Sequence, residues 1–475
     1  MDPILLWNEV ALDANLESHS NGLNEQTGPT LSSRALAIVH LAMYDAFAGV
    51  KGNPPNLPAY LTPGPAPTGA SVDAAVAGAA HKTLSDLFPS QKPFFDLKLT
   101  EAGGVVEPGH TFGVTVAQAI LADRAGDPNA SDSGYTPSQA RGRHRVDPDN
   151  PDNVERFHAP FYGKNSKGFA ITARHELAEP PFDTNEYRRA LKEVRGKGIA
   201  PELMGTLPDD IEARNVDETL IGIYWGYDGA NKIGTPPRLY NQIIRRVSKK
   251  QNNTVAENAR LFALINVAMA DAGILAWDQK YLHDFWRPVV GIREHDESMG
   301  PAATQGENDI SDNGDTLWLP LGAPASNSIK KNFTPNFPAY PSGHATFGAA
   351  ALHMARLFYN VNDRQPDDLF DRLDLVSDEF NGVNRDNKNT IRPRHVRKFP
   401  RGLWQMIEEN GRSRVYLGVH WVFDAFAIKN GKPDLDKKVD GKFIGGVPLG
   451  LQIAEDIFNG GRNKGLKISP VGPRP

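Results

Sequence analysis

The chain of 475 residues is long enough to bury a large core divided among about two to four structural units. Its 52 Lys and Arg against 57 Asp and Glu give a formal net charge of −5, which favours neither a nucleic-acid partner nor an anionic membrane surface. The absence of cysteine excludes disulfides, thiolate metal sites and thiol catalysis.

The apolar segments predict a soluble protein with no membrane partner. Residues 1–20 lack a basic region, and Asn8 and Glu9 interrupt their apolar stretch early, so we expect no N-terminal secretory signal. Export by another route is left open. The most apolar segment, residues 261–277, contains Asp271 and is shorter than the roughly 18 residues that a membrane span needs.

Helices joined by long Pro- and Gly-rich loops are predicted for the first half of the chain. Residues 31–50 begin with a pair of serines that can cap a helix, and apolar residues follow at helical spacing. The Ala-rich segments 71–88 and 112–126 show similar spacing. Residues 51–69 and 127–164 are rich in Pro, Gly, Asp and Asn, which predicts loops.

The second half predicts more helices and few strands, so an α-rich bundle architecture is expected. The predicted helices span about 210–226, 254–286, 343–359, 367–382, 402–417, 420–428 and 447–458. A Gly- and Pro-containing stretch near 200–215 suggests a division into a first unit, 1–210, and a second unit, 211–475. The two units can also form one compact body.

Three segments of the second half combine residues with chemical potential, and the first is WDQKYLHDFWRP at 277–288. Lys280 and Arg287 are seven residues apart, about two helical turns, which predicts that they share one helix face close to Trp277. Pro288 is predicted to end this helix. The alternative is that the two cations only complement the negative C-terminal end of the helix dipole.

The second segment is FPAYPSGHATFG at 337–348. Ser342 suits the N-cap of a helix, and Gly343 lets an anion approach the free N–H groups of the first turn. His344 falls in that first turn, where the positive helix end is expected to lower its pKa and keep it available as a base. The alternative is a simple capped helix with a partly exposed histidine.

The third segment is SRVYLGVHWVFDAFA at 413–427. His420 and Asp424 are four residues apart, so on a helix the carboxylate can reach the imidazole and fix its tautomer. A continuous helix would hold Arg414 about 120° away from His420. We therefore expect a break near Gly418, with Arg414 ending one helix and His420 beginning the next. A core histidine with its own carboxylate is the alternative.

Together the three segments offer two guanidinium groups, one ammonium, one hydroxyl, one exposed N–H and two imidazoles. This set suits a tetrahedral oxyanion, because the cationic donors can bind its oxygens while one imidazole binds along its axis. The second imidazole is then placed to exchange protons.

At this point the sequence resembles the vanadium-dependent haloperoxidases, which share a superfamily with the type-2 phosphatidic-acid phosphatases. The shared pattern K-x6-R-P, P-S-G-H and S-R-x5-H is present here as Lys280–Arg287–Pro288, Pro341–Ser342–Gly343–His344 and Ser413–Arg414–His420. The flanking stretches YWGYDGANKIGTPPRLYNQIIRR, LGVHWVFDA and IGGVPLGLQIAEDIFN resemble the fungal-type vanadium chloroperoxidases. LSSRALAIVHLAMYDAF and FHAPFYGK extend the similarity into the first half.

The resemblance implies an all-α fold of two four-helix bundles, with one vanadate per chain in the C-terminal bundle and no haem, flavin or NAD. His420 is implied to be the protein ligand to vanadium itself. The groups implied to bind the vanadate oxygens are Lys280, Arg287, Ser342, Gly343 and Arg414. His344 is implied to exchange protons with the incoming peroxide, while Lys280 polarises the peroxide. Asp228 is implied to hold Arg414, and Asp424 supports His420.

The implied reaction is oxidation of chloride, bromide or both by hydrogen peroxide to hypohalous acid, which halogenates small organic acceptors. Trp277 and Phe337 match the aromatic pair on the halide side of the fungal-type enzymes, although both could equally be core residues. Two alternatives remain: an acid phosphatase with His420 as nucleophile and His344 as proton donor, and an oxyanion-binding protein without turnover. The sequence does not predict the oligomeric state.

Overall fold

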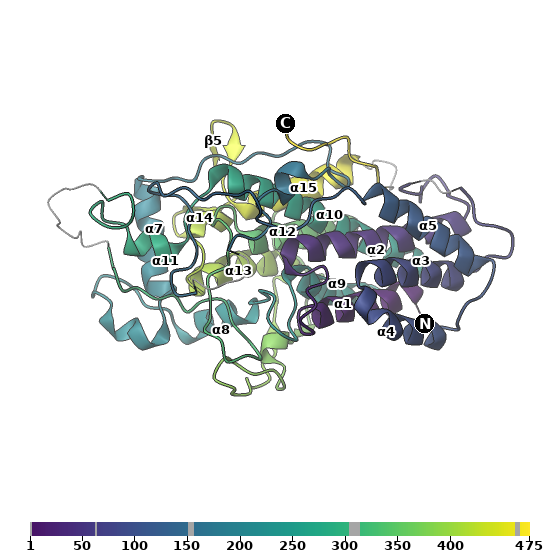
Figure 1. Cartoon of the computed structure of the whole chain (residues 1–475), viewed down its shortest axis with the longest axis horizontal. Coiled ribbons are helices and arrows are strands. Elements are labelled where there is room, and N and C mark those ends of the chain that lie inside the picture. Colours follow the sequence, from purple (N-terminus) through teal and green to yellow (C-terminus); the bar gives the residue numbers. More distant parts are fainter. Residues whose placement is uncertain (1, 62–63, 151–155, 304–313, 461–465) are drawn as a thin grey trace.

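The structure is a computed structural model that describes residues 2–61, 64–150, 156–303, 314–460 and 466–475. It is mostly helical, with only short two-stranded sheets among the described residues, which confirms the predicted all-α class. Figure 1 shows an elongated molecule in which the first helices of the chain gather at one end, α7 and α11 lie toward the other end, and the yellow C-terminal segments lie mostly in the middle.

The helices of the N-terminal end pack closely because their contacts are made by small residues. They are α1 (Pro3–Ser18), α2 (Gly28–Val50), α3 (Val72–Leu87), α4 (Lys92–Glu101) and α5 (Gly109–Asp123), with η1 (Pro89–Gln91) before α4. A Cβ added at Gly113 of α5 would lie 2.0 Å from the carbonyl oxygen of Ala75 in α3. The helices predicted at 31–50, 71–88 and 112–126 are confirmed as α2, α3 and α5 with small shifts of their ends.

The middle of the chain contributes a long central helix, α10, and shorter helices around it. These elements are α6 (Tyr162–Asn165), α7 (Asn185–Lys197), η2 (Pro201–Thr206), α8 (Val216–Tyr224), α9 (Pro236–Lys250), α10 (Val255–His283) and α11 (Pro288–Arg293). By length and composition α10 could cross a membrane, but 94% of its most apolar window is buried inside the protein. It is therefore the core helix of a soluble globular protein, as the sequence predicted.

The α10 helix packs against α2 on the N-terminal side and against α12 on the other. A buried chain of polar side chains also joins α1, α9 and α10: Asn8 of α1 donates to Asn241 of α9 at 3.0 Å, and Asn241 donates to Asn266 of α10 at 2.8 Å. Buried amides need such partners, so the network fixes how these helices meet. The division into 1–210 and 211–475 stays a prediction.

The C-terminal helices surround α12. They are α12 (Gly343–Phe358), α13 (Gly402–Tyr416), α14 (Val422–Ala425) and α15 (Gly446–Gly460). The minor elements are β1 (Asp374–Leu375), η3 (Asp378–Phe380), β2 (Arg397–Lys398), β3 (Ala427–Lys429), β4 (Lys432–Asp434), β5 (Lys438–Val439) and β6 (Lys442–Phe443). Gly446 of α15 lies so close to α12 that a Cβ there would meet the carbonyl oxygen of Ser342 at 2.5 Å.

Two predicted helices are wrong and two have different ends. Residues 367–382 form turns, β1 and η3, because Asp367 is used as a cap for other backbone groups: it accepts from the N–H groups of Leu403 and Trp404. The segment 420–428 contains only the short α14 before the chain extends into β3. The helix expected at 210–226 starts later, at Val216, since Asn215 caps it.

The helix expected at 254–286 ends earlier than predicted. It stops at His283 because Asp284 adopts a left-handed conformation with φ of 50°, and Pro288 begins α11 instead of ending α10. Lys280 and Arg287 therefore do not share a helix face: Lys280 lies in the last turn of α10, and Arg287 is the N-cap residue of α11.

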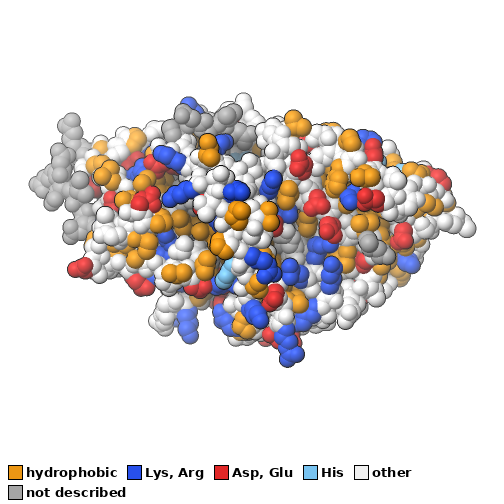
Figure 2. All heavy atoms as spheres, turned by 90° about the horizontal axis from the view of Figure 1, so that it is seen from below, with side chains coloured by type: hydrophobic (Ala, Val, Ile, Leu, Met, Phe, Trp, Pro, Cys, Tyr) orange, Lys and Arg blue, Asp and Glu red, His pale blue; other side chains and the backbone are white. Residues whose placement is uncertain are grey.

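Charge is unevenly distributed over the surface. Figure 2 shows Lys and Arg side chains gathered near the middle of one long face, whereas Asp and Glu are more frequent toward one end. A negative net charge thus coexists with locally basic surface, which acts on small anions within about 10 Å at 0.1 M salt.

Candidate active site

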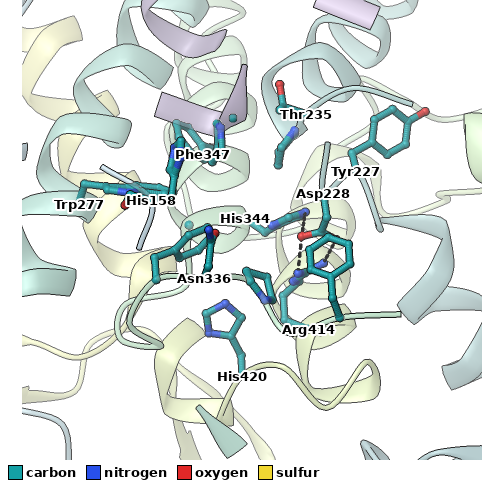
Figure 3. A pocket seen from close by; sticks show the side chains of 17 residues that line it. His158, Tyr227, Asp228, Thr235, Trp277, Asn336, His344, Phe347, Arg414 and His420 are labelled. Atoms are coloured by element: carbon teal, nitrogen blue, oxygen red, sulfur yellow. Dashed lines mark hydrogen bonds and ion pairs between the residues drawn. The ribbon is translucent and has the colours of Figure 1, made fainter. Parts of the chain in front are cut away.

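A cavity of about 110 Å³ lies where α10, α12, the α13–α14 turn and the start of α2 meet (Figure 3). The predicted residues that line it are Asp228, Trp277, Phe337, Gly343, His344, Arg414 and His420. The remaining predicted residues lie next to this lining: Lys280 at the ring of Phe337, Arg287 and Asp424 at His420, and Ser342 directly before Gly343. The fold thus brings all the predicted site residues into one place.

His420 is held by the turn between α13 and α14. The helix break expected near Gly418 is confirmed, since α13 ends at Tyr416 and Gly418 has a φ of +73°. His420 does not begin a helix, however; it precedes α14, and Asp424 occupies the first turn of that helix. The carboxylate of Asp424 therefore accepts both from the backbone N–H of Trp421 at 3.0 Å and from Nδ1 of His420 at 2.7 Å.

The tautomer of His420 follows from its two partners. A carboxylate only accepts here, so Nδ1 carries the hydrogen, and Nε2 has the lone pair that accepts from Nη1 of Arg287 at 2.8 Å. Burial, followed by the charges of Arg287 and Lys280, holds the pKa of His420 well below its usual value. Burial also raises the pKa of Asp424 to about 7.

His344 lies in the first turn of α12 and faces the cavity as a neutral base. Ser342 is the N-cap, and its hydroxyl oxygen accepts from the N–H of Ala345 at 3.4 Å. The carbonyl oxygen of His344 accepts from Asn410 Nδ2 at 2.8 Å, which fixes the backbone. Burial, then the charge of Arg414, lowers the pKa of His344 to about 3. The partly exposed histidine of the alternative reading is wrong, because His344 is only 7% exposed.

Arg414 and Asp228 form a buried bidentate pair at the cavity wall. The two guanidinium nitrogens lie 2.9 and 2.7 Å from the two carboxylate oxygens. Burial alone would raise the pKa of Asp228, but the charge and the hydrogen bonds of Arg414 help to outweigh it, and this pKa lies below its usual value. Such a fork-to-fork pair holds the guanidinium in one plane beside the cavity.

Lys280 and Arg287 both donate hydrogen bonds to the backbone of the segment 337–341, which leads into α12. Nζ of Lys280 donates to the carbonyl oxygens of Pro338 at 2.8 Å, Ala339 at 3.1 Å and Pro341. Nε of Arg287 donates to the carbonyl oxygen of Phe337 at 2.8 Å. The resemblance implies that Lys280 contacts the oxyanion directly. An ammonium has three N–H donors, and all three already donate to carbonyl oxygens, so Lys280 must give up one of these hydrogen bonds to bind the oxyanion.

Three buried cations without full compensation make this cavity suitable for an anion. Burial, then Arg287, lowers the pKa of Lys280 well below its usual value, and burial lowers that of Arg287 to about 9. Among the described residues, Nη2 of Arg287, Nε of Arg414 and Nε2 of His344 are buried without a hydrogen-bond partner. An oxyanion would accept hydrogen bonds from the two guanidinium nitrogens, and its negative charge would favour the cationic form of Lys280. No group of three or more His, Cys, Asp or Glu suited to a bare metal ion occurs in the described part of the chain.

Sequence reasoning missed several residues of the cavity wall, chiefly His158 and Asn336. The ring of His158 lies 6.0 Å from that of Trp277 and 6.1 Å from that of Phe337, measured between centroids. It rests on Gly28, where an added Cβ would come within 2.4 Å of the imidazole. His158 is far from the three motifs in the sequence, so its FHAPFYGK segment offered similarity but no spacing that predicted this position.

Comparison with known proteins agrees with the geometry. Residues 1–168 match the family model described as the vanadium chloroperoxidase N-terminal domain, and residues 260–431 match the model of the VCPO second helical-bundle domain. A vanadium chloroperoxidase from Curvularia inaequalis is 37% identical over 578 residues, covering 98% of this chain and 90% of that protein.

Two solved structures share the fold. A bacterial vanadium-dependent iodoperoxidase aligns with a TM-score of 0.58 and 20% identity, over 94% of this chain and 95% of that one. An apo-type bacterial vanadium-dependent chloroperoxidase aligns with a TM-score of 0.60 and 16% identity, over 92% of this chain and 95% of that one.

Proposed function

Because the chain belongs to the vanadium chloroperoxidase family and is a vanadium-dependent haloperoxidase, we propose which of its residues hold vanadate and what each contributes to halide oxidation. The observation that carries the proposal is the buried cation cluster around His420, whose unpaired donors fit an oxyanion. One vanadate per chain is sufficient, and neither haem, flavin nor NAD is needed.

His420 would hold vanadium through Nε2, the ring nitrogen whose lone pair now accepts from Arg287. Arg287 would then turn Nη1 and its unpaired Nη2 toward the vanadate oxygens. The further groups proposed to hold these oxygens are Lys280, Ser342, the N–H of Gly343 and Arg414. Guanidinium and ammonium donors suit them because charge-assisted hydrogen bonds are roughly twice as strong as neutral ones.

When bound, vanadate supplies Lewis acidity toward hydrogen peroxide without changing its oxidation state. His344 accepts a proton from the incoming peroxide, because burial lowers its pKa to about 3 and keeps the imidazole neutral, and its Nε2 is buried without a hydrogen-bond partner among the described residues. Asp424 keeps the hydrogen of His420 on Nδ1, and Asp228 keeps Arg414 in its plane. Lys280 adds positive charge close to the reacting oxygen, which makes that oxygen more electrophilic.

Chloride and bromide are the proposed halides, and Trp277 and Phe337 are proposed to form the halide side. Their ring centroids are 4.8 Å apart, and both rings line the cavity instead of lying only in the core. Lys280 Nζ lies 5.1 Å from the centroid of Phe337. An aromatic wall excludes water and strengthens the field of the cations next to it.

An acid phosphatase and a non-catalytic oxyanion-binding protein use the same pocket, and one experiment separates them from the proposal. Vanadate is removed, and halogenation of monochlorodimedone is measured with hydrogen peroxide and either halide during titration with orthovanadate. We expect activity that depends on vanadate in the wild type and none in His420→Ala. His344→Ala should bind vanadate yet turn over about 10²–10⁴-fold more slowly.

The opposite results are also informative. Hydrolysis of p-nitrophenyl phosphate that vanadate inhibits, together with no halogenation, would favour the phosphatase. Vanadate binding with neither reaction would favour the binding protein. Full halogenation by His420→Ala would contradict the assigned role of His420.

A further inference from the structure

A second cavity of about 350 Å³ adjoins the first. Phe333 and Asn336 line both cavities, so they form the wall between them. The loop Gly229–Asn231, which lines the second cavity, directly follows Asp228 of the first. We refer to this second cavity as the outer cavity; it lies next to the place where the proposed function generates oxidised halogen.

The charge of the outer cavity is positive. Lys330 and Lys331 line it, and no Asp or Glu does so within the described ranges. Neither ammonium makes a hydrogen bond or an ion pair with any residue that the structure describes, whereas cations such as Arg392 and Arg397 are paired with carboxylates. The two lysines can therefore bind an anionic ligand without first breaking an internal pair.

The remaining lining suits an organic anion better than a bare halide. Ala230, Ala325 and Phe333 provide apolar surface, and Asn231 and Ser328 provide polar groups at its edge. The volume falls within the about 300–1,000 Å³ typical of small-molecule pockets. A halide ion would leave most of this space and the apolar surface unused.

We propose that the outer cavity binds a small organic acceptor carrying a carboxylate or phenolate, which Lys330 and Lys331 hold next to the halogenating cavity. This inference rests on the proposed function, which supplies the hypohalous acid. A carbon of the acceptor forms a bond to halogen while the halogen–oxygen bond breaks with its electron pair going to oxygen. The carbon loses its proton, and water leaves: RH + HOX gives RX + H2O.

The test compares 4-hydroxybenzoate with its neutral methyl ester in one mixture, with bromide, peroxide and the vanadate-loaded enzyme. The ratio of the two brominated products is referred to the ratio that free hypobromous acid gives. Ion pairs of the carboxylate with Lys330 and Lys331 should raise the share of brominated 4-hydroxybenzoate over the brominated ester by about fivefold. Added salt should remove this preference, because it screens surface ion pairs. Lys330→Gln/Lys331→Gln should return the ratio to that of the free reagent.

The matched control is Lys388→Gln/Lys437→Gln, which removes the same charge from exposed lysines that line neither cavity. This control should keep both the preference and the wild-type rate of bromination of the neutral ester. A wild-type ratio equal to that of free hypobromous acid would overturn the proposal. The proposal would also be overturned if the Lys330→Gln/Lys331→Gln variant brominated both acceptors more slowly because its KM for bromide had risen. The lysines would then attract the halide instead of the acceptor.

Binding is measured separately, so that failure of the proposal differs from failure of the proposed function. Saturation-transfer NMR of 4-hydroxybenzoate with the peroxide-free protein should show binding that the Lys330→Gln/Lys331→Gln variant loses and the control retains. Binding without halogenation would contradict the proposed function alone. Absent or unaltered binding would overturn the outer-cavity assignment.

Discussion

Nη1 of Arg287 donates to Nε2 of His420 over 2.8 Å, and the opposite ring nitrogen is held by Asp424. The imidazole is thereby fixed in one tautomer and one orientation, with its lone pair directed at a cation. A ligand that binds Nε2 of His420 must replace the guanidinium of Arg287 at that nitrogen. The N–H groups of Arg287 are then free to donate to the oxygens of the ligand. The hydrogen bond between Arg287 and His420 therefore keeps both side chains ordered while no oxyanion is bound.

Asp424→Asn should weaken vanadate binding by about 10–100-fold, the usual effect of removing the partner of a ligating histidine. The amide lacks the negative charge that stabilises the Nδ1 hydrogen and keeps the lone pair on Nε2. Equilibrium dialysis against orthovanadate measures the change, with circular dichroism as a check of folding. Unchanged affinity in a folded variant would show that Arg287 alone orients the ring.

Asp228→Asn should weaken vanadate binding because Arg414 loses its bidentate partner and its fixed plane. We expect a loss of about tenfold or more in affinity, together with a lower halogenation rate. Asp367→Asn is the matched control: Asp367 pairs with the buried Arg356 at 2.9 Å, outside the cavity. The control should lower stability and leave vanadate affinity intact; equal losses in both would point to a general effect of folding.

Gly418→Ala should disturb the turn that carries His420. An added Cβ would meet the carbonyl oxygen of Gly198 at 2.4 Å, and the φ of +73° already disfavours a side chain. Gly431→Ala is its control, because Gly431 has a φ of +74° and open space around it. The control should cost about 1–2 kcal/mol of unfolding free energy. Gly418→Ala should cost more and also reduce vanadate affinity, whereas equal effects would exclude the steric argument.

Phe337→Leu should lower the ratio of chloride to bromide kcat/KM by about three- to tenfold. The Phe337 ring lies 4.9 Å from the guanidinium carbon of Arg287 and 5.1 Å from Lys280 Nζ, and such contacts contribute about 0.5–2 kcal/mol each. Chloride is harder to oxidise, so its rate depends more on the field that these cations set. Steady-state rates with each halide provide the ratio; a parallel fall for both would show that the ring only packs.

His40 should make the protein less stable as pH falls from about 6.5 to about 4. Burial lowers its pKa to about 4, and its ring nitrogens contact the carbonyl oxygen of Leu36 at 2.6 Å and Nδ2 of Asn8 at 2.9 Å. In this window the unfolded chain binds a proton that the folded one does not. The unfolding free energy therefore falls by up to about 1.4 kcal/mol per pH unit through this residue.

Denaturant unfolding of the wild type and of His40→Gln between pH 4.5 and pH 7 measures this contribution. The variant should show a pH slope smaller by up to one proton, and the difference between the two slopes should disappear as the pH approaches 7. Parallel curves for the two proteins would mean that His40 titrates alike in both states.

Local signals predicted the parts of the site that depend on neighbouring residues. The cap at Ser342, the break near Gly418 and the contact of Asp424 with His420 each depend on residues only a few positions apart in the sequence. The contact of Asp228 with Arg414 came from family resemblance, because nothing local to either residue indicates the other.

The rest depends on tertiary contacts that the sequence pattern does not contain. The carbonyls around Lys280 come from a loop about 60 residues later, so helical spacing could not reveal that the ammonium is already used. The left-handed Asp284 ends α10 without a Gly or Pro at that position. His158 and Asn336 reach the cavity only because separate loops close over it.

The α10 helix has a consequence for how this fold can change over evolutionary time. One side of it lies against the first half of the chain and the other against α12, while its last turn carries Lys280. Exchange of the first half for that of a distant relative by recombination would leave the surface of α10 poorly packed. Because Lys280 lies in the last turn of this helix, poor packing would also disturb the candidate active site. Inheritance should therefore favour exchange of loops, such as those around the outer cavity, over exchange of whole halves.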